Sequence, residues 1–200
     1  MVSKLFGEGA FAQDRQHVLM LMGLFVLSFA LYVSTMSRGI TWLNTGHDGG
    51  DFISAARAFG VPHPTGYPTY TLLLRVFGDV VAIGDHAFRA NLLSALLGAA
   101  TVPLVYVAAL RLLKMLPGNE VGGIGSLWVS ALMAALAFGT SRLFWSQATI
   151  TEVYTLNALF GSALLVLTLG LVRDLTAGRR ALRNRILMTL LLGVGFGNHT

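Results

Sequence analysis

The run Ala90–Leu110, ANLLSALLGAATVPLVYVAAL, contains no charged residue over 21 positions. A helix needs about 20 apolar residues to cross the 30 Å hydrocarbon core of a bilayer, so this run is predicted to span a membrane. The whole chain agrees, because its 200 residues are 54% hydrophobic and only 12% charged. Soluble domains usually carry about 25% charged residues. The sequence therefore predicts an all-α membrane protein.

Uncharged runs of similar length lie on both sides of this one, at residues 18–37, 121–141 and 153–172. A last apolar run, 186–200, is too short for a comfortable span. We therefore expect a polytopic helical bundle, a single transmembrane domain over 1–200 that is the N-terminal part of a longer protein. A signal peptide is the alternative for the first run, but its apolar core is longer than usual and no small-x-small cleavage site follows.

The basic residues set the expected orientation, because cytoplasmic segments are enriched in lysine and arginine. With the N-terminus in the cytoplasm, nine of the 14 basic residues lie inside, five of them within 173–185, and five lie outside. The loop 38–89 and the segment 142–152 are then extracytoplasmic. This multi-pass protein would lie in the plasma membrane of a bacterium or archaeon, or in the endoplasmic reticulum of a eukaryote.

Several other functions are disfavoured. The net charge of +5 comes mainly from residues at the ends of apolar runs, where they act as topology signals and contact lipid headgroups. The sequence has no stripe of basic residues interleaved with aromatic residues, so nucleic-acid binding is not predicted. No lysine follows the glycines of 122–125 in the Walker pattern, and no nucleophile elbow or zincin motif is present. The chain has no cysteine, which excludes disulfides and thiolate metal sites.

The loop 38–89 contains most of the polar motifs. Within it, Asp51–Phe59 and Tyr67–Ile83 have apolar residues at helical spacing and are predicted to form two short helices. Both are too polar to span a bilayer and suit helices at the membrane interface. Two polar stretches, His47–Asp51 and His63–Pro68, gather two carboxylates, two imidazoles and helix-breaking residues in this loop.

Asp48 and Asp51 are the candidate catalytic residues. A partly desolvated carboxylate beside the bilayer can have its pKa raised and act as a general base. The alternative is structural. A helix that begins near Gly49 would put Asp48 at its N-cap and Asp51 in its first turn, where acids satisfy free N–H groups and suit the helix dipole.

The corner His63–Pro68 is predicted to hold His63 and Tyr67 against the helix that follows Asp48. Each proline favours extended backbone in the residue before it, and Gly66 permits a tight turn. A rigid corner between two helices would explain the same residues without any catalytic role.

A divalent metal is a further hypothesis for the loop. Its ligands would be His47, Asp48, Asp51 and His63. These side chains are suitable ligands, but their spacing follows no regular metal-binding pattern. We therefore expect no cofactor.

The second outer segment, 142–152, ends in its only acid, Glu152, and Tyr154 follows. A glutamate at a helix start is usually a first-turn acid, and such a tyrosine an interfacial aromatic. Glu152 could nevertheless face Asp48 across a cavity, and His199 is expected near the same level. Polar groups at membrane depth are candidate functional residues.

Four motifs together resemble a family of multi-span proteins long catalogued as a domain of unknown function, whose animal member is a protein O-mannosyltransferase. They are Asp48-Gly49-Gly50-Asp51, Gly60–Pro68, Glu152-Val153-Tyr154 and Gly197-Asn198-His199. The family resembles a branch of the GT-C glycosyltransferases, which use polyprenyl-phosphate-linked sugars. The resemblance runs from about residue 20 to the end of the chain and implies an N-terminal GT-C membrane module.

The resemblance also implies substrates and roles. The donor would be a polyprenyl-phosphate-linked sugar, with mannose as one candidate, and the acceptor a hydroxyl of a protein or glycan. The acidic residue of the first outer loop that faces both would be Asp48 first and Asp51 second, although the family often has Glu at the second position. A cation must hold the donor phosphate. The candidates for it are Arg57, Arg75, Arg89, Arg142 and His63. The other candidate substrate-binding residues are Tyr67, Glu152, Tyr154 and His199.

Two further function classes stay open. A transporter or lipid-binding carrier would place ionisable residues deep inside spans, and the four complete runs contain none. In a non-catalytic assembly subunit, Asp48 and Asp51 would only cap a helix.

Overall fold

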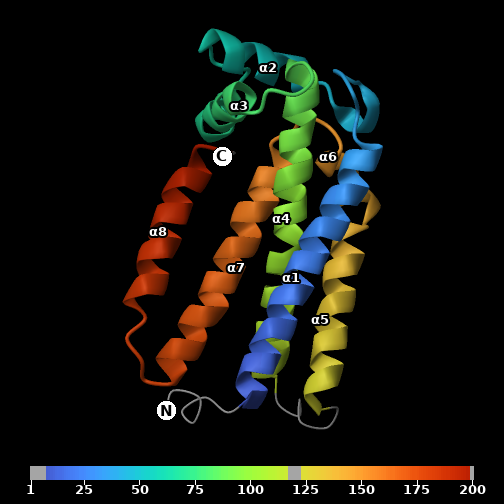
Figure 1. Ribbon diagram of the computed structural model, residues 1–200. Helices are drawn as coiled ribbons and strands as arrows, with labels where there is room; N and C mark the ends of the chain where they lie inside the picture. Colours follow the sequence, from blue (N-terminus) through green and yellow to red (C-terminus); the bar gives the residue numbers. More distant parts are fainter. Residues whose placement is uncertain (1–7, 117–122, 199–200) are drawn as a thin grey trace.

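The computed structural model describes the backbone of residues 8–116 and 123–198, with side chains from residues 15 and 125 onward in these two parts. In this part of the chain all regular structure is helical. The elements are α1 Glu8–Thr35, the 3₁₀ turn η2 Leu43–Thr45, α2 Gly49–Ala58, α3 Pro68–Val80, α4 His86–Met115, α5 Gly123–Gly139, α6 Arg142–Ala148, α7 Tyr154–Thr176 and α8 Leu182–Phe196. The five longest helices form a bundle, and α2 and α3 lie across one end of it (Figure 1).

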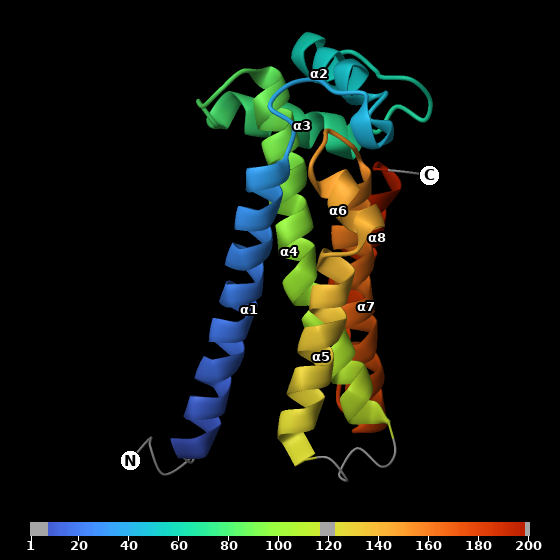
Figure 2. The same cartoon turned by 90° about the vertical axis from the view of Figure 1, so that its right-hand side faces the viewer.

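Three helical stretches in the described residues are long and apolar enough to cross a membrane: Arg15–Thr35, His86–Met115 and Tyr154–Thr176. A fourth span is formed if α5 and α6, which are bent by 61°, are one broken helix. The predicted all-α membrane class is therefore confirmed. The two short helices predicted within the loop 38–89 are confirmed as α2 and α3, which cover the bundle at the end opposite α1's first turn (Figure 2).

Helix α4 is the centre of the bundle and packs against α1, α5 and α7. Small residues on α4 allow this, because they let neighbouring backbones approach closely. At Gly98 an added Cβ would lie 2.9 Å from the Cβ of Ala148 on α6, which is too close for any larger side chain. The uncharged run that predicted a span is thus also the core of the bundle.

The break between α5 and α6 differs from the sequence prediction. The uncharged run continues to Ser141, but α5 ends at Gly139, and a second short helix follows in the expected outer segment. The buried Tyr32 hydroxyl donates a hydrogen bond of 2.7 Å to the carbonyl of Gly139. This bond satisfies a carbonyl at the helix end that has no partner in the next turn.

A buried polar network joins α4 to the loops beside it. The Asn91 side chain is 2% exposed and donates to the carbonyls of Ser37 at 2.9 Å and Gly39 at 3.0 Å. Its carbonyl oxygen accepts from the Thr151 hydroxyl at 2.6 Å. Asn91 therefore ties the chain after α1 and the chain before α7 to one point on α4, just below the cap.

Replacing Asn91 by Ala is expected to lower the free energy of unfolding by about 2 kcal/mol, because buried groups lose their partners. Thermal unfolding of the purified protein in detergent measures the effect. Thr151→Val provides the partner variant, and the double variant is expected to lose less than the sum of the two single losses. Fully additive losses would contradict a shared network.

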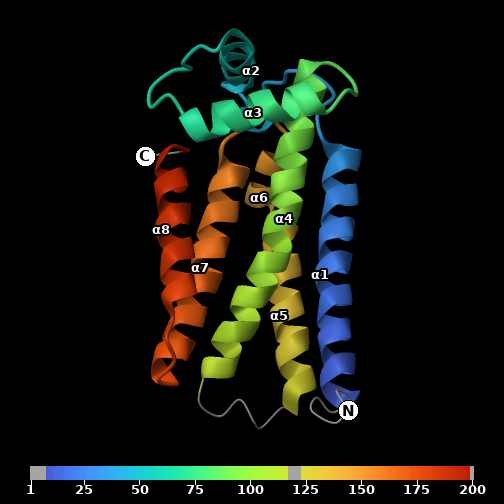
Figure 3. The ribbon, with the colours of Figure 1, turned by 60° about the vertical axis from the view of Figure 1, so that its left-hand side comes forward.

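The end of α8 is fastened to the cap. The Thr69 N–H donates to the carbonyl of Gly197 at 2.8 Å, and its hydroxyl donates to the carbonyl of Val194 at 2.8 Å. Asn198, fully buried, donates to Val153 and to the side chain of Asn157. Figure 3 shows α3 lying above the end of α8. This clasp connects the last helix to the loop that contains the candidate site.

Candidate functional site

Two carboxylates of the loop 38–89 lie beside one imidazole. His63 lies in the loop between α2 and α3, and its Nδ1 is 2.8 Å from Oδ2 of Asp51. Its backbone N–H also donates to Asp51, at 2.9 Å. Its Nε2 lies 3.6 Å from Oδ2 of Asp48. The predicted grouping of these residues is therefore present, and we call Asp48, Asp51, His63 and Glu152 the acid cluster.

Asp51 and Asp48 differ in what they bind. Two hydrogen bonds from His63 hold the pKa of Asp51 below its usual range. The bond from the backbone N–H has the larger effect, and the bond from the ring has the smaller one. Asp48 is the N-cap residue of α2, but its side chain makes no capping hydrogen bond. The structural explanation predicted for Asp48 therefore lacks its central contact, and about half of its side-chain surface remains exposed.

Aromatic rings fix the orientation of His63. The ring centroid of Phe52 lies 5.4 Å from the imidazole, and that of Tyr67 lies 5.2 Å from it. The corner is closed by a hydrogen bond from the Gly66 N–H to the His63 carbonyl at 2.9 Å, and Gly66 has a φ of 90° that favours glycine. The predicted corner thus holds His63 and Tyr67 against α2.

Glu152, the last member of the acid cluster, comes from a segment far from the other three in the sequence. It lies between α6 and α7 and is only 2% exposed. Burial, and after it the nearby carboxylate of Asp48, raises the pKa of Glu152 to about 7. Glu152 therefore lies within electrostatic range of Asp48. The pKa of a carboxyl placed in this way favours its protonated form up to neutral pH.

Two buried polar residues near Glu152 were not identified from the sequence. The backbone N–H of Glu152 donates to the hydroxyl of Ser94 at 3.5 Å. Tyr70 is fully buried, and this burial raises the pKa of its hydroxyl. The charge of the nearby Glu152 carboxylate also raises this pKa. Ser94 lies inside an uncharged apolar run, where a single serine gives no signal of a site.

The remaining predicted residues have other surroundings. Arg57 forms an ion pair with Asp79 at 2.5 Å. Arg142 lines a cavity of about 400 Å³ beside α6 together with Asn44 and Trp145. Tyr154 is half exposed at the start of α7 and lies within electrostatic range of Glu152 and Asp48. His199 lies outside the described residues, so its predicted place stays untested.

The hypothetical metal ligands were compared with the arrangements that a metal ion needs. Across the described side chains, no group of three or more His, Asp or Glu residues has an arrangement that could hold a metal ion. His47, one of the four hypothetical ligands, has its ring 5.3 Å from that of Trp42.

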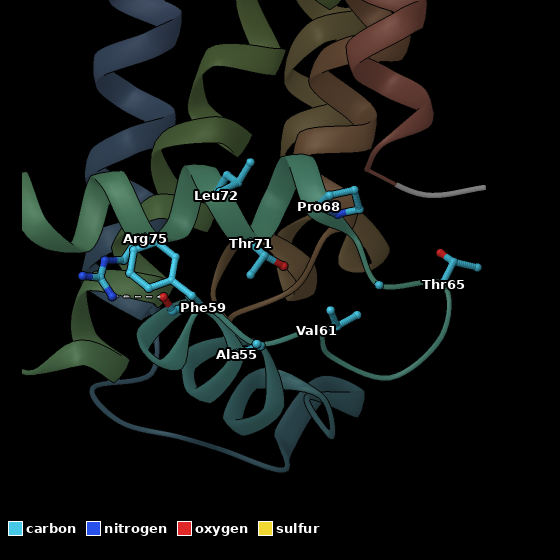
Figure 4. Close-up of a pocket in the computed structure, with 11 residues that line it drawn as sticks. Ala55, Phe59, Val61, Thr65, Pro68, Thr71, Leu72 and Arg75 are labelled. Atoms are coloured by element: carbon cyan, nitrogen blue, oxygen red, sulfur yellow. Dashed lines mark hydrogen bonds between the residues drawn. The ribbon is translucent and has the colours of Figure 1, made fainter.

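Two apolar cavities lie near the cluster. One, of about 410 Å³, lies between α2 and α3, and Figure 4 shows Phe59, Val61 and Leu72 around it. At its edge the guanidinium of Arg75 lies 4.3 Å from the ring centroid of Phe59. The other, of about 670 Å³, is lined by residues of α5, α6 and α7, including Tyr154. Glu152 itself does not line this second cavity.

Comparisons with known proteins give a consistent result. A family model described as "Protein O-mannosyl-transferase TMEM260 N-terminal domain" matches residues 48–200, which include the whole acid cluster. The chain is similar to the mouse protein O-mannosyl-transferase TMEM260, with 37% identity over 139 residues that cover 70% of this chain and 18% of the mouse protein. It is also similar to the protein of that name from Dictyostelium discoideum, with 26% identity over 72% of this chain and 16% of that relative.

The chain therefore spans less than a fifth of the length of these curated relatives. No solved structure matches it.

Proposed function

Since this chain belongs to the TMEM260 N-terminal domain family, we propose that it forms the catalytic membrane module of a protein O-mannosyltransferase. In this proposal, mannose moves from a polyprenyl-phosphate carrier to an acceptor hydroxyl at the extracytoplasmic face, by a GT-C-like mechanism. The observation that supports it most is the acid cluster at the capped end of a membrane bundle. The extracytoplasmic assignment rests on the distribution of basic residues.

Asp48 is the proposed general base. Transfer requires a group that removes the proton of the acceptor hydroxyl as its oxygen attacks the sugar carbon, and a partly exposed carboxylate can do this. Asp51 is committed to two hydrogen bonds with His63, whereas the Asp48 side chain makes no capping bond. The base role is therefore assigned to Asp48, and Asp51 becomes a positioning residue that orients the imidazole.

Glu152 and Asp48 form a pair of acids with different proton affinities. A pair whose environments separate the two pKa values allows one group to stay ionised while the other holds a proton. Burial gives Glu152 its raised pKa of about 7. In the proposal, protonated Glu152 adds no negative charge beside Asp48, which limits electrostatic repulsion of the donor phosphate.

Arg142 is the proposed phosphate-binding residue. The other arginine candidates already bind protein groups: Arg57 and Arg75 pair with Asp79, and Arg89 donates to three backbone carbonyls. In the described part of the chain, Arg142 has no hydrogen-bonded or ion-paired partner and borders the 400 Å³ cavity. The neighbouring apolar cavity at Tyr154 would accommodate part of the polyprenyl chain.

The proposed function is tested with the full-length protein in membranes, using radiolabelled polyprenyl-phosphate mannose and acceptor peptides that contain serine and threonine. Transfer is expected to depend on the lipid-linked donor. A parallel reaction with radiolabelled GDP-mannose, in membranes depleted of polyprenyl phosphate, is expected to give no product. Product formed from the nucleotide sugar alone would contradict the donor class, and no product from any lipid-linked sugar would contradict the enzyme class.

The positioning role of Asp51 gives a separate prediction. Asp51→Ala is expected to lower kcat/KM by up to about 100-fold, because a catalytic site loses rate steeply when a group moves by 1 Å. Asp51→Glu retains an acceptor for His63 and is expected to recover most of this loss. Steady-state transfer assays measure both variants. Equal activity of Asp51→Ala and the wild type would show that His63 needs no fixed orientation.

A further inference from the structure

The cavity of about 400 Å³ beside α6 lies at the end of the bundle that α2 and α3 cover (Figure 2). It is formed where α1 ends and where α5 breaks into α6. Apart from the indole of Trp145, every side chain that lines it carries a hydroxyl, amide or guanidinium group. We call this cavity the polar pocket. The proposed transfer reaction uses only Arg142 from it, for the donor phosphate.

Hydroxyl oxygens form one wall of the polar pocket. The hydroxyl of Thr140 donates to the carbonyl of Leu136 at 2.7 Å, and that of Thr149 donates to the carbonyl of Ser146 at 2.9 Å. A hydroxyl has one hydrogen, so these two oxygens can only accept a hydrogen bond from a ligand. A phosphodiester has acceptor oxygens alone and cannot satisfy them. The hydroxyl groups of a sugar can donate to this wall.

The other side chains of the pocket suit the same kind of ligand. Within the described ranges, the Asn44 amide and the Arg142 guanidinium are exposed and form no hydrogen bond to the protein. The amide can both donate and accept, and the guanidinium can bind a phosphate. The indole of Trp145 is fixed by a hydrogen bond of 2.9 Å from its Nε1 to the Thr35 hydroxyl. A fixed aromatic ring provides an apolar platform for the C–H face of a sugar.

Asn44 lies in a turn whose backbone is strained. Asn44 and Thr45 have φ values of 57° and 63°, in the left-handed region that a β-branched residue such as threonine rarely adopts. The side-chain amide of Gln147 on α6 donates to the carbonyl of Asn44 at 3.2 Å and helps to hold the turn. Strained backbone of this kind occurs at ligand-binding sites, where the surrounding structure maintains it. The turn therefore fixes Asn44 at the wall of the pocket.

The polar pocket adjoins the acid cluster and the apolar cavity at Tyr154. Asn44 lies four residues before Asp48, and Thr149 lies three residues before Glu152. Four residues of chain extend over at most about 14 Å, so this wall is close to the acids. Three residues of the pocket are each followed in the chain by a residue that lines the apolar cavity. A lipid-linked sugar could thus place its headgroup in one cavity and its chain in the other.

We propose that the polar pocket binds the sugar of the lipid-linked donor, and that Asn44 determines specificity by hydrogen-bonding one of the sugar hydroxyls. This inference rests on the proposed mannosyl transfer, and it adds the place of the sugar and the residue that recognises it. Arg142 holds the phosphate of the same donor, and Trp145 supports the sugar ring. The bond from Asn44 is lost when hydrogen replaces the hydroxyl that it binds.

The test uses the full-length protein in membranes and polyprenyl-phosphate donors that carry mannose or one of its monodeoxy analogues. The wild type is expected to lose about 10-fold in kcat/KM with the analogue that lacks the recognised hydroxyl, because a polar group is left unpaired. The variant Asn44→Gly removes the amide and keeps the turn, since glycine adopts left-handed backbone readily. It is expected to lose about 10-fold with mannose and to use mannose and that analogue equally well.

The matched control is Thr45→Gly, which places a glycine at the next left-handed position. Thr45 does not line the polar pocket, so this variant is expected to keep the wild-type preference for mannose over the analogue, whatever its rate. Arg142→Gln is expected to slow all donors by the same factor, because they share the phosphate. Loss of the preference in Thr45→Gly as well would assign the effect to the turn and overturn the proposal.

Two other results would overturn it. One is equal slowing of all donors by Asn44→Gly, which would show a structural role. The other is a wild type that uses every deoxy donor as well as mannose. Both leave the proposed function intact, because mannose is still transferred, whereas a wild type that transfers no lipid-linked sugar would overturn the function and the inference together. Melting temperatures of the variants establish that they are folded.

Discussion

Replacing Asp48 by Asn is expected to lower the rate of mannosyl transfer by about a hundredfold to ten-thousandfold, the usual contribution of a general base. The substitution keeps the size and shape of the side chain and removes only its ability to accept a proton. Because the Asp48 side chain makes no capping hydrogen bond, the start of α2 does not depend on its charge. The loss is therefore expected in kcat/KM at unchanged melting temperature, measured with the full-length protein.

The matched control for this prediction is Asp85→Asn. Asp85 is also the N-cap residue of a helix at the same end of the bundle, and its side chain accepts from the Phe88 N–H at 2.7 Å. Asparagine caps helices as well as aspartate does, so this variant is expected to be active and stable. If Asp48→Asn retained wild-type transfer while both variants were folded, the base would have to be another group.

Replacing Glu152 by Gln is expected to stabilise the protein above pH 7 and to remove a large part of its pH dependence. The pKa of Glu152 is raised from 4.5 to about 7 in the folded protein. Below pH 4.5 the carboxyl is protonated in both the folded and unfolded states, and the shift has no cost. As the pH rises towards 7 the unfolded state ionises first, so stability falls by about 3 kcal/mol in all.

The measurement is the difference in melting temperature between wild type and Glu152→Gln from pH 4.5 to pH 8. The difference is expected to grow through this window and to level off above pH 7. Asp48→Asn provides an internal check, because the Asp48 carboxylate is one cause of the raised pKa. When Asp48→Asn is present in both proteins, the pH range over which the difference in melting temperature grows is expected to become narrower. A difference that is constant with pH would mean that Glu152 has an ordinary pKa.

The sequence predicted best those features that depend on hydropathy or on contacts between residues close together in the chain. Uncharged runs are enough to predict membrane helices, and α2 and α3 followed from apolar spacing within a polar loop. His63 lies only 12 residues from Asp51. Asp51 lies in the first turn of a short helix and His63 in the Pro/Gly corner after it, so their contact could be predicted. The link to Glu152 came from the expected orientation of the spans, which places both outer segments on one side.

What the sequence could not show depends on tertiary contacts. The bend at Gly139 involves no charged residue, so hydropathy continues through it, and the bend depends on packing against α4 and the Tyr32 hydroxyl. Arg57 was a candidate for binding phosphate because its partner, Asp79, is 22 residues away. Asn91 lies inside an apolar run, where a polar residue gives no sign of the carbonyls that it will bind.

The clasp between Thr69 and the end of α8 has a consequence for biosynthesis. It joins groups 125 residues apart, so it cannot form while the ribosome is still translating the chain between them. At a translation rate of about 5 to 20 residues per second, the end of α8 is synthesised roughly 6 to 25 seconds after α3. Nascent chains stalled before α8 are therefore expected to show a protease-sensitive α2–α3 cap, and this cap becomes resistant only after the last helix has been inserted.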